Sequence, residues 1–189
     1  MKKNLLLNHP QDEFVSNMIY QILDAVDPKK AVINQCALNG NQFTVADTSY
    51  DLDSYEKVHV IGFGKAVLAM ALGAAAVLGE KINGGYLITK HFDEEKQAQL
   101  PESCIVTKGN HPVPGKDTFE SSAGLVNYAQ SIGENDLVLV LISGGGSALC
   151  SSPIDGVSPD EMQEMTKQLL ACGAEIQEMN AIRKHLDQI

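Results

Sequence analysis

The stretch Asp136-Leu-Val-Leu-Val-Leu-Ile-Ser-Gly-Gly-Gly-Ser147 decides the fold class. The apolar run at 137–142 is unbroken, which predicts a strand buried on both faces, as in a parallel sheet covered by helices. The run stops at Ser143, and three glycines follow before the next serine. Ligands of open α/β sheets bind where parallel strands end, so this glycine loop is a candidate binding loop.

Working back from this strand, the chain alternates short β runs with helical patterns. Further strands are predicted at 58–61, 85–89 and 104–107. Helices are predicted between and after the strands, at 65–79, 117–132 and 158–172, and again at 174–189 beyond Gly173. This order predicts βαβ units and therefore an α/β fold, with a mostly parallel, Rossmann-like sheet and helices on both faces.

Capping signals place several helix starts. Ser158-Pro159-x-Glu161 is a strong start, and Asp117 with Glu120 predicts a capping box for the helix at 117–132. Upstream, apolar residues at every fourth position predict an amphipathic helix over 11–26. Asp27-Pro28 then predicts a second helix that runs to about Leu38, with Asn39-Gly40-Asn41 ending it. Residues 42–56 are polar and predict a weak strand and a loop.

Composition excludes some classes of partner. The chain has 189 residues, 44% of them apolar, and a net charge of −10, which argues against nucleic acid or an anionic membrane as a partner. No stretch is long and apolar enough to span a membrane, and no targeting segment is convincing. The four cysteines lack zinc-site spacing, so we expect reduced thiols and a cytoplasmic location.

The first candidate site is the turn Gly62-Phe-Gly64-Lys65, between a strand and a helix. Backbone N–H groups at a helix start attract an anion, and a lysine there favours a phosphate or carboxylate ligand. A Walker A loop would need glycine at position 59, which is His59, and a dinucleotide fingerprint would need glycine at position 67, which is Val67. A plain tight turn is the alternative.

Two more loops follow strands. Three glycines flanked by hydroxyls, in the segment Ser143-Gly144-Gly145-Gly146-Ser147, form a nest of N–H groups for an anion, with a flexible turn as the alternative. The second loop carries His111, a candidate ligand for a substrate or a phosphate, within Asn110-His-Pro-Val-Pro114. A stiff loop with a hydrogen-bonded histidine explains His111 equally well.

The last candidate group lies on the predicted C-terminal helix. Glu178, Asn180 and Arg183 share this helix, and Arg183 can clamp a carboxylate through two parallel hydrogen bonds. A solvated helix face with paired charges is the ordinary alternative.

Four blocks together resemble the class II glycerate kinases, the glycerate 2-kinase family with a MOFRL-type C-terminal region. The blocks begin with Gly62-Phe-Gly-Lys-Ala66 and Gly109-Asn-His-Pro-Val-Pro114. They continue with 136–148 and with the segment 173–186, which contains Asn180-Ala-Ile-Arg-Lys-His185. The order and spacing are those of the family.

The resemblance implies ATP-dependent phosphorylation of D-glycerate, with Mg²⁺ and with 2-phosphoglycerate as the favoured product. It implies catalytic roles for Lys65 and Arg183, and binding roles for the other candidates named above. Members of the family are about twice as long, so residues 1–189, with a helical lead-in at 1–40, are expected to be an N-terminal domain whose second domain is missing. We expect a monomer or a homodimer.

Other functions stay open at this stage. A hydroxypyruvate reductase is one alternative, although Val67 replaces the third glycine of the dinucleotide fingerprint. A non-catalytic fragment that binds an anion or a nucleotide is a second. A sugar-phosphate-binding α/β domain would share the glycine loop but would not explain the other three blocks. No general base is identified from the sequence.

Overall fold

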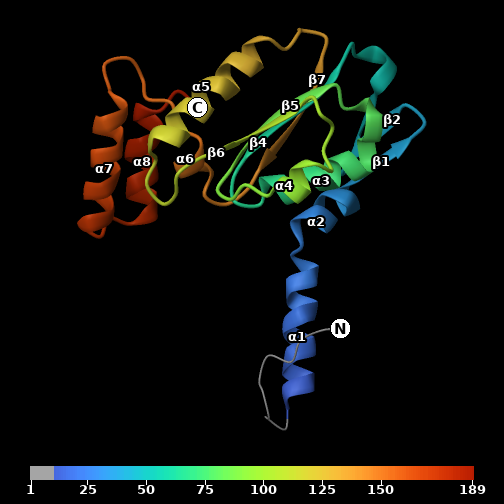
Figure 1. The fold of residues 1–189 in the computed structure, drawn as a ribbon, viewed down its shortest axis with the longest axis horizontal. Coiled ribbons are helices and arrows are strands. Elements are labelled where there is room, and N and C mark those ends of the chain that lie inside the picture. The colour runs from blue at the N-terminus through green and yellow to red at the C-terminus, as the bar shows by residue number, and fades with distance from the viewer. Residues whose placement is uncertain (1–10) are drawn as a thin grey trace.

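A four-stranded, fully parallel sheet forms the centre of the molecule (Figure 1). The structure is a computed structural model that describes residues 11–189. The strand order is β6-β5-β4-β7, and the strands are β4 (Val58–Phe63), β5 (Gly84–Thr89), β6 (Cys104–Lys108) and β7 (Leu137–Ile142). Each predicted strand is therefore present, within two residues of its expected ends, and the parallel α/β fold is confirmed.

Helices cover both faces of this sheet. On one face α3 (Val67–Leu78) packs against a core that includes Val60, Leu87 and Leu141. It is apolar around its circumference because α2 (Pro28–Gln35) crosses its outer side. On the other face α5 (Lys116–Gln130) covers β5 and β6 through a second core cluster.

Four further helices complete the fold. The short α4 (Glu94–Gln97) lies beside α3, and α6 (Gly146–Leu149), α7 (Pro159–Ala171) and α8 (Ile176–Leu186) follow β7. The helix start predicted at Ser158-Pro159-x-Glu161 is confirmed, and it is a capping box in which each side chain bonds the other residue's backbone N–H. Gly173, at φ +74°, separates α7 from α8 as expected.

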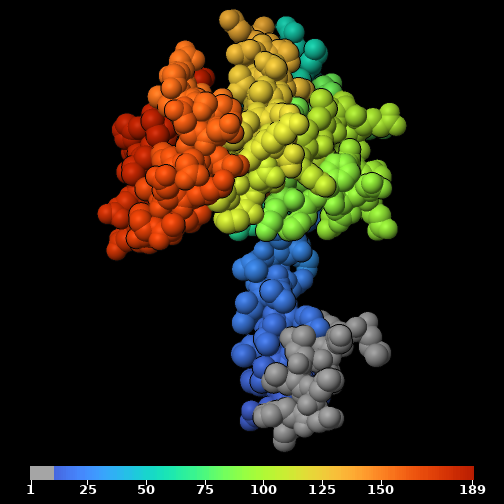
Figure 2. All heavy atoms as spheres, turned by 60° about the vertical axis from the view of Figure 1, so that its left-hand side comes forward, coloured from blue at the N-terminus to red at the C-terminus, as the bar shows by residue number. Residues whose placement is uncertain are grey.

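The N-terminal helix α1 (Asp12–Ala25) projects away from the body of the molecule (Figure 1 and Figure 2). The amphipathic helix is confirmed, yet its apolar stripe of Phe14, Met18, Ile22 and Val26 is exposed. Asp27 caps α2 as predicted, because its carboxylate accepts a hydrogen bond from the Lys30 N–H at 2.8 Å. The first ten residues of the expected helical lead-in lie outside the described residues.

The prediction for 36–56 was wrong. In place of a helix end and one weak strand, three strands form a separate antiparallel sheet: β1 (Cys36–Asn39), β2 (Gln42–Val45) and β3 (Thr48–Asp51). Asn39-Gly40-Asn41 does not end a helix but turns a hairpin, with Gly40 at φ +59°. The sheet is stabilised by Phe43, only 2% exposed, which packs into the main core. Two short 3₁₀ turns lie at 52–54 and 79–81.

The expectation that 137–142 is buried on both faces was also wrong. Within the described chain β7 pairs with β4 alone and forms the edge of the sheet, and Val140 and Ile142 are 50% and 61% exposed. The apolar run correctly predicts a strand. It does not encode which elements lie beside that strand, and α5 does not extend far enough across the sheet to cover it.

The predicted cap of α5 was wrong as well. The helix begins one residue earlier, with Gly115 as its N-cap, and the Asn110 side-chain oxygen accepts a hydrogen bond from the Thr118 N–H in its first turn at 3.2 Å. The carboxylate of Asp117 instead accepts a hydrogen bond from the Asn110 side-chain amide at 3.0 Å. Asp117 thus holds the 109–114 loop against the start of α5.

Candidate functional site

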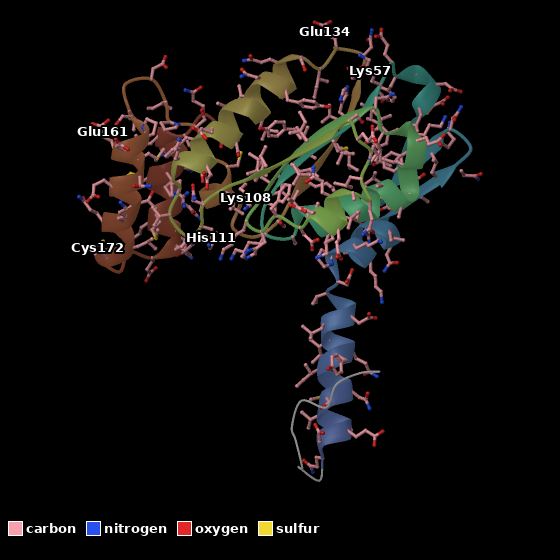
Figure 3. The ribbon with its side chains drawn as sticks, viewed as in Figure 1. Lys57, Lys108, His111, Glu134, Glu161 and Cys172 are labelled. Carbon is pink, nitrogen blue, oxygen red and sulfur yellow. The ribbon has the colours of Figure 1, made fainter. Side chains whose placement is uncertain are left out.

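The carboxyl ends of all four parallel strands lie on one edge of the sheet, next to α7 and α8 (Figure 3). The loop after β6 carries His111, and Figure 3 shows it at this edge, whereas Lys57 and Glu134 lie at the opposite end. The turn after β4 carries Lys65, and the loop after β7 carries the glycines. The parallel order of the strands thus gathers the predicted loops at one edge.

Hydrogen bonds join the turn after β4 to the loop after β7. The Lys65 N–H donates to the Gly144 carbonyl at 3.0 Å, and the Ala66 N–H donates to the Ser143 hydroxyl at 3.0 Å. Gly64 has φ +131°, and a Cβ there would stand 2.6 Å from the Ser143 carbonyl oxygen. The two glycine segments therefore form one rigid unit, in which Lys65 precedes α3 and does not belong to it.

Lys65 and His111 meet above Gly145. A Cβ at Gly145 would stand 2.6 Å from Lys65 Cε and 2.9 Å from His111 Cδ2, so both side chains cover this glycine. Gly145 has φ +87°, a left-handed conformation that glycine adopts without strain. The glycine thus leaves room for a lysine and a histidine directly over its backbone.

Lys90 belongs to the same group, and the sequence reasoning missed it. In the sheet register Phe63 lies beside Ile88 and Thr89 lies beside Lys108, so Lys90 follows the strand between the one that carries Lys65 and the one that leads to His111. Loss of solvation lowers the pKa of His111 below 6.5, and the charges of Lys65, Lys90 and Arg183 lower it further. In the sequence, Lys90 could have been noticed because it comes directly after a predicted strand. The same position is equally typical of a charged surface loop.

Arg183 lines a pocket of about 260 Å³ beside this group. Its side chain is buried, 8% exposed, and its Nη2 has no hydrogen-bond partner among the described residues. Burial lowers the pKa of the guanidinium, while the Asp187 charge raises it. The other lining residues are Phe63, Ser147, Cys150, Asn180, Lys184, Asp187 and Ile189. An unpartnered, buried guanidinium facing a small pocket calls for an anionic ligand.

Asp187, the only acidic side chain among the described residues that line the pocket, does not form an ion pair with Arg183. Asp187 instead accepts hydrogen bonds from the Ser151 hydroxyl at 2.6 Å and from the Ser152 N–H at 2.8 Å. These bonds hold the end of α8 against the segment that follows α6. The positive charge of Arg183 therefore remains available to a ligand.

The remaining predicted site residues differ in where they lie. Asn180 and Ser147 line the Arg183 pocket, and Gly146 is buried at the start of α6. Gly62 lies within β4. Glu178 is exposed and does not line the pocket, since its carboxylate accepts a hydrogen bond from the Glu175 N–H at the start of α8. The structure therefore does not bring Glu178 together with the other candidates.

The groups gathered at this edge do not fit a magnesium ion. Magnesium prefers carboxylate and phosphate oxygens, whereas the side chains here are cations, amides and hydroxyls. The carboxylate of Asp187 is already occupied by backbone and serine donors. Residues 11–189 contain no group of three His, Cys, Asp or Glu side chains arranged to hold a metal.

The fold and the site together define a class: a parallel α/β domain with glycine loops and unpaired cations at the carboxyl edge of its sheet. The family model described as "Domain of unknown function (DUF4147)" matches residues 14–189, and the chain belongs to this family. The glycerate kinase names of the relatives described next confirm the resemblance to that family. In the described residues no helix is long and apolar enough to cross a membrane.

The named relatives are kinases. The chain is 40% identical over 134 residues to a D-glycerate 2-kinase of Thermotoga maritima, which covers 71% of this chain and 31% of the relative. It is 34% identical to a glycerate kinase of Danio rerio, covering 87% and 34% of the two chains. The crystal structure of a Thermotoga maritima glycerate kinase matches with a TM-score of 0.69 at 32% identity, covering 92% of this chain and 38% of that one. The chain thus spans about a third of the length of these curated relatives.

Proposed function

We propose that this chain is the N-terminal α/β part of a glycerate kinase, which transfers a phosphoryl group from ATP to D-glycerate and forms 2-phosphoglycerate. The observation that carries the proposal is a set of cations around a glycine loop, Lys65, Lys90 and Arg183, none of which forms an ion pair within residues 11–189. Cations gathered in one place repel one another, and a bound anion relieves that repulsion. The names of the relatives supply the reaction.

The proposed chemistry uses positioning and charge, as phosphoryl transfer generally does. The 2-hydroxyl oxygen of glycerate attacks the γ-phosphorus of ATP, the bond to the ADP oxygen breaks, and the hydroxyl proton is released. Lys65 neutralises charge on the transferring group, and the backbone N–H groups of 143–147 hold the anion. Arg183 holds the glycerate carboxylate through two parallel hydrogen bonds. Mg²⁺, which ATP normally carries, is assigned no residue here.

The proposal includes a second domain that closes the site. The relatives extend well beyond the matched region, and a closed cleft excludes water from a phosphoryl-transfer site. We therefore expect the 189-residue chain by itself to bind ligands but to show little turnover. A cytoplasmic location and a monomeric or dimeric state are part of the same proposal, the location being supported by the four unpaired cysteines.

The experiment is a coupled assay with ATP and D-glycerate on a protein that contains this chain together with the rest of the family's length. Lys65→Ala is expected to lower turnover by roughly 10²–10³-fold, since it removes a charge from the transferring group and leaves no core cavity. Lys57→Ala, at the opposite end of the sheet, is the matched control and should leave turnover unchanged. Near-normal rates in Lys65→Ala would remove Lys65 from the mechanism. Absence of turnover in the wild type would favour a binding module over an enzyme.

A further inference from the structure

The free side of β7 can accept another strand. In the described chain β7 pairs with β4 alone, and the Leu137 N–H donates toward β4, to the Lys57 carbonyl at 2.8 Å. Because successive N–H groups of a strand point to opposite sides, those of Val138, Val140 and Ile142 point to the free side. The strand contains no charged residue, proline or glycine, which are features that keep an exposed strand from pairing.

One face of β7 is also uncovered. In the sheet register Val140 lies beside Ile61, and Ile142 lies beside Phe63. Ile61 and Phe63 pack against the core cluster under α5, but Val140 and Ile142 are 50% and 61% exposed. Large apolar side chains that continue a covered row into solvent indicate a surface that another element covers.

A small apolar pocket lies beside the start of this strand. Its volume is about 110 Å³, and its walls are Phe43, Val45 and Tyr50 of the antiparallel sheet and residues 137–139 of β7. This volume is of the same order as the roughly 150 Å³ of an engineered apolar cavity that holds one benzene molecule. The pocket therefore has room for one apolar side chain from an added strand.

The strand order indicates what the added element is. Numbered along the chain, the four parallel strands lie in the order 3-2-1-4, and β7 is the fourth. A common doubly wound sheet has the order 3-2-1-4-5-6, in which the next parallel strand pairs with the free side of the fourth. About two-thirds of each named relative lies outside the matched region, which is ample length for such a strand.

The handedness of the crossovers agrees with this order. α3 connects β4 to β5 on one face of the sheet, and α5 connects β6 to β7 in the opposite direction on the other face. A right-handed connection from β7 to a strand beyond it continues in that second direction, so it crosses on the α5 face. Val140 and Ile142 are exposed on this face, and Leu149 and Cys150, which follow β7, already pack there.

We propose that the free side of β7 is the docking site of a fifth parallel strand, which belongs to the part of the family's length outside residues 1–189. The connection to this strand covers Val140 and Ile142, and one of its apolar side chains fills the pocket beside Phe43. The proposal concerns how the sheet is completed, so it goes beyond the proposed reaction and does not depend on it.

The test compares the 189-residue chain with the longer protein that contains it together with the rest of the family's length. Val140→Lys is expected to lower the Tm of the longer protein by at least ~5 °C, because an ammonium group without a partner is buried there. In the 189-residue chain the lysine reaches water, so the Tm should change by less than ~2 °C. If the longer Val140→Lys protein does not fold, Val140→Thr gives the same contrast with a smaller loss.

Ile105→Lys is the matched control. Ile105, Tyr86, Ile61 and Val140 form one row across the sheet, and the row ends at Ile105 and Val140 on the two edge strands. Their exposed fractions, 48% and 50%, are nearly equal. Because the strand order assigns the added strand to β7 alone, Ile105→Lys should change the Tm by less than ~2 °C in both proteins.

Hydrogen exchange detects the strand itself. The N–H groups of Val140 and Ile142 should exchange with deuterated water at least ~100-fold more slowly in the longer protein than in the 189-residue chain, because ladder hydrogen bonds protect them. If Val140→Lys destabilises only the longer protein but exchange is unchanged, a helix covers this face without a paired strand, and the proposed strand is wrong.

Two further outcomes would overturn the proposal. Equal Tm changes for Val140→Lys in the two proteins would mean that nothing in the longer protein covers β7. A dimer of the 189-residue chain that Val140→Lys converts to a monomer in sedimentation would assign the free side to a second copy. None of these measurements uses ATP or glycerate, so failure here leaves the proposed function standing, and failure of the kinase assay leaves this proposal standing.

Discussion

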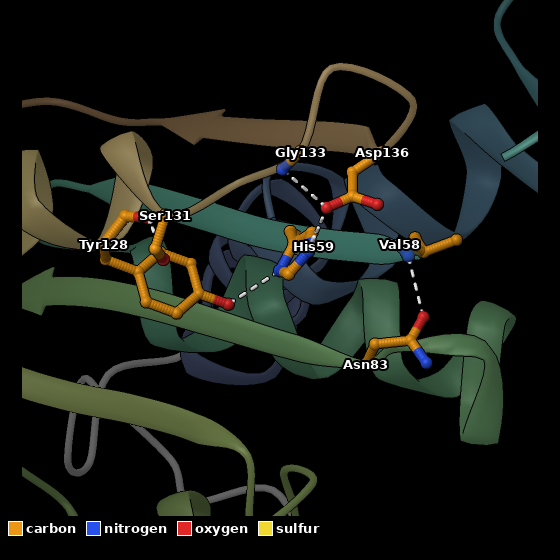
Figure 4. Close-up of polar contacts among 7 residues, drawn as sticks. All are labelled: Val58, His59, Asn83, Tyr128, Ser131, Gly133 and Asp136. Atoms are coloured by element: carbon orange, nitrogen blue, oxygen red, sulfur yellow. Dashed lines mark hydrogen bonds and ion pairs between the residues drawn. The ribbon is translucent and has the colours of Figure 1, made fainter. Parts of the chain in front are cut away.

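The two ends of the central sheet each present a histidine, and the two histidines have opposite surroundings. At the amino end His59, which is 9% exposed, has both ring nitrogens bonded (Figure 4). Its Nδ1 lies 2.8 Å from the Tyr128 hydroxyl and its Nε2 lies 3.2 Å from Asp136 Oδ2. At the carboxyl end His111 has neither nitrogen bonded within the described residues, and its neighbours are cations.

The network at the amino end is internally complete. The Gly133 N–H, followed by the hydrogen bond from His59, lowers the pKa of Asp136, so this side chain is a carboxylate at neutral pH. A carboxylate only accepts hydrogen bonds, so His59 Nε2 carries a proton and donates it. In the neutral imidazole Nδ1 then accepts from the Tyr128 hydroxyl, whose pKa is raised by burial. Every polar group has a partner, which is the pattern of a structural network.

The difference between the two ends supports the proposal that the carboxyl end is the functional one. Both are built from loops of a parallel sheet, and both contain charged and aromatic residues. At the amino end the buried His59 and Asp136 are each other's partners, whereas at the carboxyl end the buried Arg183 guanidinium keeps one nitrogen without a partner among the described residues. An unsatisfied buried group, and not polarity itself, therefore favours the carboxyl end as the binding end.

The largest expected effect concerns stability at the amino end. His59→Ala should lower the free energy of unfolding by about 3 kcal/mol, because it empties a buried position, removes two hydrogen bonds and leaves the Tyr128 hydroxyl without its partner. His111→Ala is the matched change at the other end and should cost well under 1 kcal/mol, since His111 makes no hydrogen bond in the described chain. Urea denaturation followed by circular dichroism measures both. Equal losses in the two variants would contradict the comparison.

A smaller effect is expected at the binding edge. Gly145→Ala introduces a Cβ 2.6 Å from Lys65 Cε and 2.9 Å from His111 Cδ2, which displaces both side chains. The affinity for inorganic pyrophosphate, which serves as a probe for the proposed anion site, should fall about tenfold, equivalent to ~1.4 kcal/mol. Gly156→Ala is the control, because Gly156 has φ +89° against +87° for Gly145 and an added Cβ there meets nothing within 4 Å. It carries the same backbone strain without the contact, so a similar loss of affinity in Gly156→Ala would assign the effect to strain.

The sequence predicts the framework of the sheet because strand starts and stops are local signals. Val58–Phe63 and Gly84–Thr89 are mostly apolar runs that contain or adjoin glycine, and the residues within and beside each run are enough to set its ends. The position of Leu137–Ile142 at the edge is not local. It depends on which other elements pair with the strand and cover it, and an apolar run carries no information about them.

The same distinction explains the site. Lys65 and the 143–147 loop are found from the sequence because glycine in a strand-to-helix turn has a local cause. Lys90 is missed because only the sheet register places it between the strands that lead to Lys65 and His111. Glu178 illustrates the opposite error, since a carboxylate near Arg183 in the sequence is used to cap the helix that both share.

The smallest expected effect is the pH dependence of anion binding, and it tests whether His111 belongs to the proposed anion site at the carboxyl end of the sheet. Loss of solvation and the charges of Lys65, Lys90 and Arg183 lower the pKa of His111 below 6.5 in the free chain. A bound anion raises that pKa, so binding takes up a proton and affinity rises as the pH falls from 8 toward 5.5. Sulfate is the suitable probe because its own charge is constant over this range. We expect a gain of about threefold to tenfold in the wild type. His111→Gln should give a flat profile, and His185→Gln, on the exposed side of α8, should keep the slope. If the sulfate affinity of the wild type does not change with pH, the His111 imidazole does not belong to the proposed anion site.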